Sequence, residues 1–222
     1  MAIDTQSGFL RHAMTGFALG AALMSAVPMY ASAEEVSGEF LGARSEKAWS
    51  IMLFGGPMVD AELADIVIPS GSIDGTGTTF VGVALNKRVY EFDGWASGFT
   101  IELEAGAGYQ FGESPDESGQ IWAAAYGRYD EFPWNHIVRT TVAASVGLNY
   151  STEKTAYENN ETKVGNTKHV LHYFSPEITF SAPSNPDDEL VLRLHHRSSA
   201  SGAFGCEGCG SNYITFGYRK RF

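Results

Sequence analysis

The chain has few basic residues for its size, and after its first 33 residues it has no long apolar run. Fifteen Lys and Arg stand against 26 Asp and Glu, which gives a formal net charge of −11. No basic stripe is available to replace counterions on phosphates, and this argues against a nucleic-acid partner. No later stretch approaches the ~20 consecutive apolar residues that a membrane-spanning helix requires. The composition instead suits a secreted β-domain or a transmembrane barrel with a polar interior.

Cysteine is also scarce, with only Cys206 and Cys209 in the motif CEGC. In an oxidising compartment this spacing predicts a small local disulfide. Two cysteines are too few ligands for a structural zinc site, and the Gly-rich stretch lacks the helix N-terminus that a redox CxxC motif uses. The sequence therefore implies no metal and no other cofactor.

The first 33 residues have the features of a secretory signal. Arg11 and His12 give a weakly basic start, residues 13–30 are mostly small and apolar, and residues 31–33 supply an A-x-A cleavage site. The apolar run is short for a transmembrane anchor, and acidic residues follow it. We therefore predict Sec-type export and removal of residues 1–33, with residues 34–222 forming one domain.

Alternation of apolar and polar residues predicts β-strands in the remaining chain. The pattern is clearest at residues 99–111, where period two holds without a break, which helical periodicity cannot mimic. Segment 56–77 is expected to be an exposed loop with one helical turn near residues 60–66. Eight strands are predicted, at residues 47–55, 78–90, 98–111, 120–130, 138–150, 168–181, 189–198 and 212–222.

Three features favour an all-β fold of the eight-stranded antiparallel outer-membrane β-barrel type over a soluble sandwich or a lipocalin-like barrel. The strands run about ten to fourteen residues, enough for the ~9–11 that cross a bilayer. Short turns with aromatic residues or Pro alternate with longer polar connections. The polar face carries charges at mid-strand, which a sandwich core cannot hold unpaired but a side-chain-filled lumen can pair. These charges are Arg88, Glu102, Glu104, Arg128, Arg139, Glu177, Arg193 and Arg219.

Aromatic residues support the same topology. Trp95, Phe132 and Trp134 fall in short turns and are predicted to join a periplasmic aromatic girdle. The chain ends on Phe222, which resembles the C-terminal signature that the barrel-assembly machinery reads. We therefore predict location in the outer membrane of a Gram-negative cell.

The seventh predicted strand carries the chemistry. On a strand, Leu190, Leu192, Leu194, His196 and Ser198 share one face, and the residues between them share the other. In a barrel the leucine face meets lipid, where ionisable groups are expensive and indicate function. A serine becomes a nucleophile when a base lies within hydrogen-bond reach. With this topology, the group attacked is a lipid of the outer leaflet.

These residues resemble the lipid A 3-O-deacylases of the PagL type. His196-Arg197-Ser198 matches their H-x-S motif near the outer end of the penultimate strand, and residues 199–202 loosely match the Asn-Ala-Gly that follows. The resemblance implies that Ser198 is the nucleophile and His196 the general base, acting on an ester-linked acyl chain of lipid A. It also implies that backbone amides from Ser199 to Gly202 stabilise the oxyanion.

The sequence departs from that family at two positions. Where the family has its orienting Glu, this chain has Gly210, and where the family has an Asn beside the nucleophile, this chain has Ser199. Glu207 is the nearest acid of the loop and is predicted to take the orienting role. Loss of the orienting group misorients the imidazole and costs orders of magnitude in rate.

Other interpretations stay open at this point. In a non-catalytic structural or lipopolysaccharide-interacting barrel, His196 and Ser198 form a polar rim, and long acidic loops bridge to divalent cations or partners. His195 is the base instead if a bulge shifts the register. His172 is expected to be an interfacial residue near the outer end. A pore is disfavoured, because side chains fill the interior of eight strands.

Overall fold

The computed structural model of the protein describes residues 44–68, 73–112, 117–155, 157–158 and 166–222. Residues 1–33, predicted to be a cleaved signal, lie outside this part of the chain. None of the helices in the described ranges is both long and apolar enough to cross a membrane.

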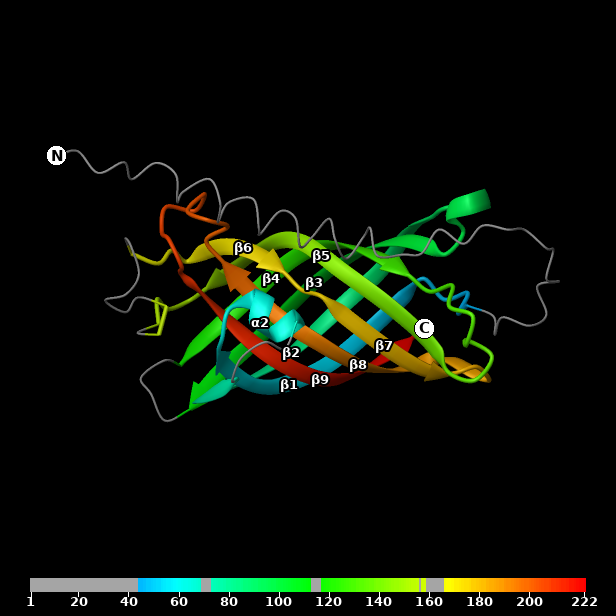
Figure 1. The fold of residues 1–222 in the computed structure, drawn as a ribbon, viewed down its shortest axis with the longest axis horizontal. Coiled ribbons are helices and arrows are strands. Elements are labelled where there is room, and N and C mark those ends of the chain that lie inside the picture. Colours follow the sequence, from blue (N-terminus) through cyan, green and yellow to red (C-terminus); the bar gives the residue numbers. More distant parts are fainter. Residues whose placement is uncertain (1–43, 69–72, 113–116, 156, 159–165) are drawn as a thin grey trace.

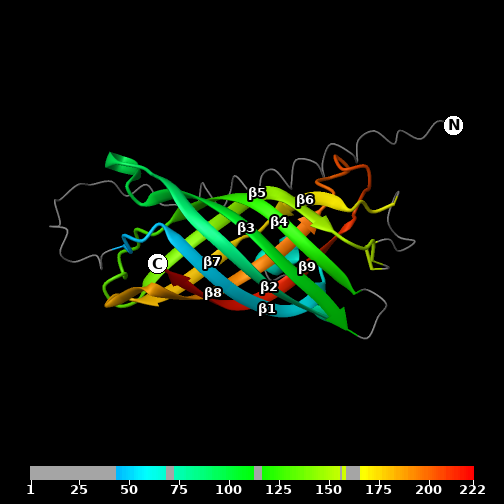
Figure 2. The same cartoon turned by 180° about the vertical axis from the view of Figure 1, so that it is seen from behind.

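The described strands form one closed antiparallel sheet around a lumen (Figures 1 and 2). Each strand pairs with its neighbours in the order β4-β3-β2-β1-β9-β8-β6-β5-β7, and pairings of β4 with β5 and of β8 with β7 complete the ring. β6 and β7 are two halves of one strand, so the ring has the eight strands that the sequence predicts. Their bounds are β1 Trp49–Asp60, β2 Asp74–Glu91, β3 Phe99–Gly112, β4 Ser118–Tyr129, β5 Arg139–Ser151, β6 Val170–Phe174, β7 Glu177–Ala182, β8 Asn185–Ser198 and β9 Gly210–Arg221.

The two ends of the barrel differ. Short connections at residues 92–98, 130–138 and 183–184 lie at one end, the turn end, where the Phe222 N–H also donates to the Trp49 carbonyl at 2.9 Å. Trp95 lies in one of these turns, η1 (Gly94–Ala96), and its side chain is almost fully exposed. The connections at the opposite end, the loop end, are longer except for the one at residues 113–117.

The sixth predicted strand is interrupted at Ser175 and Pro176. Proline has no N–H to give to a ladder and is disfavoured inside a sheet. The Ser175 N–H donates instead to Ser145 Oγ at 2.9 Å, and the Pro176 carbonyl accepts from the Leu194 N–H at 3.0 Å. Both halves still lie between β5 and β8, so the break leaves the ring closed.

The first hairpin is longer than the sequence predicts. β1 continues to Asp60 and β2 begins at Asp74, which lies directly opposite. β1 approaches β9 closely at Gly56, where a Cβ atom would lie 1.9 Å from the Ile214 carbonyl oxygen. The predicted helical turn is α2 (Leu63–Val67), which lies outside the barrel over β8 and β9 (Figure 1) and behind the strands in the reverse view (Figure 2).

Strand alternation separates an apolar outer face from a polar lumen. All eight mid-strand charges that the sequence analysis placed inside are buried. The exposed outer residues form a surface suited to lipid and include Ile51, Leu53, Val83, Leu103, Ile121, Val146, Leu148, Leu190 and Phe216. The fold is therefore the predicted eight-stranded barrel with its apolar side outward.

Ion pairs fill the half of the lumen nearer the turn end. Arg193 contacts Glu104 at 2.7 Å and Glu177 at 2.6 Å. Arg219 joins Glu177 at 2.8 Å to Glu189 at 2.9 Å. The lumen here is packed with paired side chains, as expected for a barrel of this size.

Aromatic rings fill the half nearer the loop end, and His195 lies among them. Its ring stacks on Phe80 with centroids 4.4 Å apart. Its Nδ1 lies 3.1 Å from the Tyr173 hydroxyl, and its Nε2 lies 3.1 Å from Gln120 Oε1. β8 pairs with β9 without a register shift. The alternative in which a bulge makes His195 the base is therefore wrong.

Candidate active site

β8 places His196 and Ser198 on the outward face at the loop end. Along this face Leu190 and Leu192 are 50% and 46% exposed, whereas Leu194 is only 7% exposed. His196 and Ser198 are half-buried. The face therefore passes from an open apolar surface to a partly covered site at the end of the strand.

Strand register gives His196 its neighbours. Asn212 of β9 and Phe174 of β6 lie directly opposite it, one on each side. His196 Nδ1 lies 2.5 Å from Asn212 Oδ1, and the Phe174 ring meets the imidazole edge-on with centroids 6.5 Å apart. Because a carbonyl oxygen only accepts, Nδ1 carries the hydrogen, and Nε2 is left with a free lone pair. The hydrogen bond from Nδ1 to Asn212 thus orients the imidazole and leaves Nε2 to act as the base.

Ser198 lies between His172 of β6 and Gly210 of β9. The Cα atoms of His196 and Ser198 are about 7 Å apart, as two strand residues must be. Within the described ranges the Ser198 hydroxyl has no hydrogen-bond partner, and neither has the His172 imidazole. Catalytic hydrogen bonds are often long without substrate and tighten in the complex. His172, predicted to be interfacial near the outer end, is a direct neighbour of Ser198.

Gly210 stands where the resembling family carries its orienting acid, and the backbone here favours glycine. Its φ is 146°, which side chains rarely adopt. A Cβ atom would also lie 2.1 Å from the Arg197 carbonyl oxygen and 2.9 Å from Ser198 Cα. No acidic side chain fits at this position without moving the site itself.

We expect Gly210→Ala to lower the free energy of unfolding by about 1–3 kcal/mol, the usual cost of a strained backbone position. Urea titration in lipid vesicles, followed by tryptophan fluorescence, measures the change. Gly75→Ala is the matched control, because a Cβ atom there meets nothing within 4 Å. Equal midpoints for the two variants would contradict the clash at Gly210.

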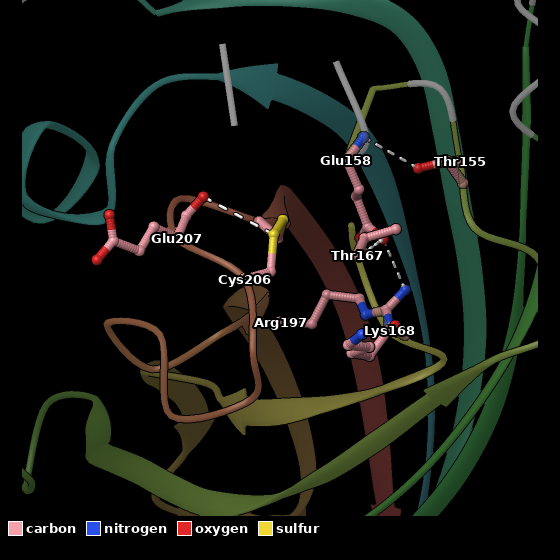
Figure 3. Close-up of a disulfide and its surroundings, with 8 residues drawn as sticks. Thr155, Glu158, Thr167, Lys168, Arg197, Cys206 and Glu207 are labelled. Carbon is pink, nitrogen blue, oxygen red and sulfur yellow. Dashed lines mark hydrogen bonds and ion pairs between the residues drawn. A yellow bond between two sulfur atoms is a disulfide. The ribbon is translucent and has the colours of Figure 1, made fainter. Parts of the chain in front are cut away.

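Glu207 does not lie where the orienting role requires. The Ser199 N–H donates to the Cys209 carbonyl at 2.9 Å, which closes the hairpin, so residues 200–208 project beyond the strands. Glu207 is exposed on this projection, and its carboxylate points away from Arg197 in Figure 3. Asn212, not Glu207, lies behind the imidazole. The sequence prediction missed Asn212, although counting back from a hairpin closed near Cys209 pairs it with His196.

The same loop corrects the predicted oxyanion donors. The Ser199 amide is occupied by Cys209 and is not available. Ala200 and Ser201 adopt φ values of 47° and 55°, and Gly202 has φ 90°. Their three amides donate no hydrogen bond within the part of the chain that the structure describes. The amides of Ala200, Ser201 and Gly202, and not that of Ser199, are therefore the unoccupied donors of this loop among the described residues.

Cys206 and Cys209 form a disulfide at the base of this loop, with Cα atoms 5.8 Å apart. Figure 3 shows it near Arg197 and Glu158, which contact each other at the loop end of the barrel. Glu158 accepts from Arg197 at 3.2 Å and from Ser211 Oγ at 2.9 Å.

Glu158, in the described part of the connection between β5 and β6, is therefore held against β8 and β9 at the loop end. The neighbouring Tyr157 hydroxyl donates to Asp60 at 2.8 Å. Burial and this carboxylate raise the pKa of Tyr157. The described residues contain no group of three or more His, Cys, Asp or Glu that could hold a metal ion.

Comparisons with known proteins concern the fold. No protein-family model and no curated protein matches the chain. The crystal structure of the outer membrane enzyme PagL is similar at 12% identity, with 78% of this chain and 99% of that chain covered and a TM-score of 0.56. Neisserial surface protein A (NspA) is 9% identical, with 78% of this chain and 96% of that chain covered and a TM-score of 0.47. Ail, the attachment invasion locus protein of Yersinia pestis, is 12% identical, with 79% of this chain and 99% of that chain covered and a TM-score of 0.38. The chain thus has the outer-membrane β-barrel fold that the PagL structure shares.

Proposed function

We propose that the protein is an ester hydrolase of the Gram-negative outer membrane that removes an ester-linked acyl chain from lipid A. The observation that carries the proposal is the 2.5 Å hydrogen bond between His196 and Asn212 on the outward face, two residues from Ser198. A nucleophile, a base and an orienting amide recur in the Cys-His-Asn hydrolases, so an amide can serve as the third member. The H-x-S resemblance supplies the substrate class.

The residues have distinct roles in the proposed reaction. Ser198 Oγ bonds to the ester carbonyl carbon while its proton passes to His196 Nε2. Amides of residues 200–202 stabilise the oxyanion that forms. The bond to the leaving oxygen then breaks, and His196 returns its proton to that oxygen. Water next gives a proton to Nε2 and attacks the acyl carbon. The bond from that carbon to Ser198 Oγ breaks, Oγ takes the proton back from Nε2, and the fatty acid is released.

The location follows from the same surface. With the turn end in the periplasm, the loop end and Ser198 lie at the outer leaflet, where lipid A is found. Phe222 is exposed at the turn end, in line with recognition by the barrel-assembly machinery. Sec-type export and removal of residues 1–33 complete the proposed route.

The test is mass spectrometry of lipid A from cells that express the chain or its Ser198→Ala variant. We expect loss of one acyl mass with the wild type and none with Ser198→Ala. Heat-modifiable gel mobility shows whether both barrels assemble. Ser97→Ala is the matched control, because Ser97 lies at the turn end and hydrogen-bonds to Glu131.

A second candidate function is a non-catalytic barrel that contacts lipopolysaccharide. It is favoured because, among the described residues, an amide and no carboxylate backs His196, and an amide does not neutralise an imidazolium. Identical lipid A in cells with assembled wild-type and Ser198→Ala barrels would support this candidate and contradict the hydrolase.

A further inference from the structure

Residues 61–68, here called the 61–68 segment, comprise α2 and the residues on either side of it and form one side of the site. Asn212 Nδ2 donates to the Ala61 carbonyl at 2.7 Å, a contact between residues 151 apart in sequence. Asn212 is only 8% exposed and Leu194 only 7%, although both face outward, where Leu190 and Leu192 are about half exposed. Figure 1 shows α2 lying over β8 and β9. The segment therefore covers the site from the β9 side.

The contact with Ala61 decides which way the Asn212 amide points. A backbone carbonyl only accepts hydrogen bonds, so the amide nitrogen faces Ala61, and the amide oxygen is left to face His196. Turning the amide by 180° would set oxygen against oxygen at Ala61 and the NH2 group against Nδ1. Nδ1 would then have to accept, which moves the imidazole hydrogen to Nε2.

The position of that hydrogen decides whether His196 can act. With the hydrogen on Nδ1, Nε2 has the lone pair that takes the Ser198 proton. With the hydrogen on Nε2, the nitrogen that must act as base has no lone pair to offer, and the wrong tautomer costs orders of magnitude in a related triad. A carboxylate would avoid this problem, because both its oxygens accept.

We propose that the 61–68 segment is a positioning element that fixes the His196 tautomer through Asn212. This inference rests on the proposed function. Ala61 contributes a carbonyl to Asn212, which contributes an oxygen to His196. An asparagine as third member thus brings a requirement that a carboxylate does not have, namely a fixed acceptor behind its nitrogen. The first hairpin of the barrel supplies that acceptor.

The test removes the segment and compares two side chains at position 212. Asp60 and Asp74 are directly paired, so an Asn-Gly turn in place of residues 61–73 can close the hairpin. This shortened chain is made with Asn212 and with Asn212→Asp, and assembly is checked by heat-modifiable mobility. Nitrogen-15 NMR of the imidazole in detergent micelles reports the His196 tautomer, and release of fatty acid from lipopolysaccharide in mixed micelles reports the rate.

We expect the Nδ1–H tautomer in the full chain and its partial replacement by Nε2–H in the shortened chain. Shortening should lower the rate about fivefold or more when Asn212 is kept, because a mobile amide samples the wrong orientation. In the Asn212→Asp background it should lower the rate by less than about twofold, because the two carboxylate oxygens are equivalent. Ile68→Gln, a change of an exposed side chain within the segment, should keep the Nδ1–H tautomer.

An unchanged tautomer in the shortened chain would overturn the positioning role whatever the rates. Equal rate losses on shortening in the Asn212 and Asn212→Asp backgrounds would overturn it too. If the full chain releases no fatty acid at all, the proposed hydrolase fails. The tautomer comparison still decides the positioning role in that case, because it needs no substrate.

Discussion

Arg193→Met is expected to lower the free energy of unfolding by about 3–5 kcal/mol, because it leaves buried carboxylates without their cation. Arg193 is fully buried in the lumen and donates to both oxygens of Glu104, at 3.0 and 2.7 Å. Glu177 keeps Arg219 at 2.8 Å after the change, whereas the remaining partners of Glu104 among the described residues are the neutral donors Trp122 and Tyr126. Most of the loss should therefore arise at Glu104.

Urea titration in lipid vesicles measures the loss, and Leu190→Met on the same strand is the control because its side chain faces lipid. Adding Glu104→Gln to Arg193→Met should recover part of the stability, since it removes the uncompensated charge. A loss for Arg193→Met no larger than for Leu190→Met would show that the ion pairs contribute nothing. No recovery in the double variant would point to packing rather than charge.

The eight strands could be predicted because one physical rule governs all of them. A barrel in lipid needs apolar side chains outside and polar ones inside, so period two persists along each strand, most clearly in β3. The rule also placed the lumen charges, including Arg193. Alternation does not show where the hydrogen bonds between strands are interrupted. Residues 168–181 were therefore predicted as one strand, although Pro176 indicates the break.

The candidate site was less predictable because it depends on pairing between strands. His196 and Ser198 follow from alternation within β8 alone. Asn212 becomes a neighbour of His196 only when the hairpin register is known, and register depends on where the turn closes. The Ser199 amide was assigned from the family resemblance and Glu207 as the nearest acid of the loop, but the hydrogen bond between Ser199 and Cys209 closes the hairpin so that neither lies where its role requires.

The contact between Asn212 and Ala61 is harder still to predict from the sequence. Nothing local marks residues 61–68 as a neighbour of β9, because the segment folds back along the outside of the barrel. Its burial of Asn212 depends on the long first hairpin, which the sequence analysis ended at residue 55. The element that distinguishes this site therefore lies in the region where periodic patterns are weakest.

His196→Ala is expected to reduce release of fatty acid from lipopolysaccharide at least about 10⁴-fold, as does loss of a base or nucleophile in other triads. His196 has the only imidazole in the described chain that is backed by Asn212, whereas His172, the cross-strand neighbour of Ser198, has no orienting partner among the described residues. Ser198→Ala should cost as much, because either change prevents the same step. Asn212→Leu should cost less, since the base remains but loses its orientation.

The double variant distinguishes a catalytic unit from two separate contacts. If Ser198 and His196 act together, His196→Ala with Ser198→Ala should be no slower than either single variant, because the second change removes nothing that still works. If they only bind lipid at a polar rim, their effects should be small and additive. His169→Ala is the imidazole control, because this ring stacks on Tyr150 of β5 with centroids 5.7 Å apart and is not a strand partner of Ser198. Fatty-acid release, with assembly checked by gel mobility, therefore decides between the two functions that the outward face of β8 allows.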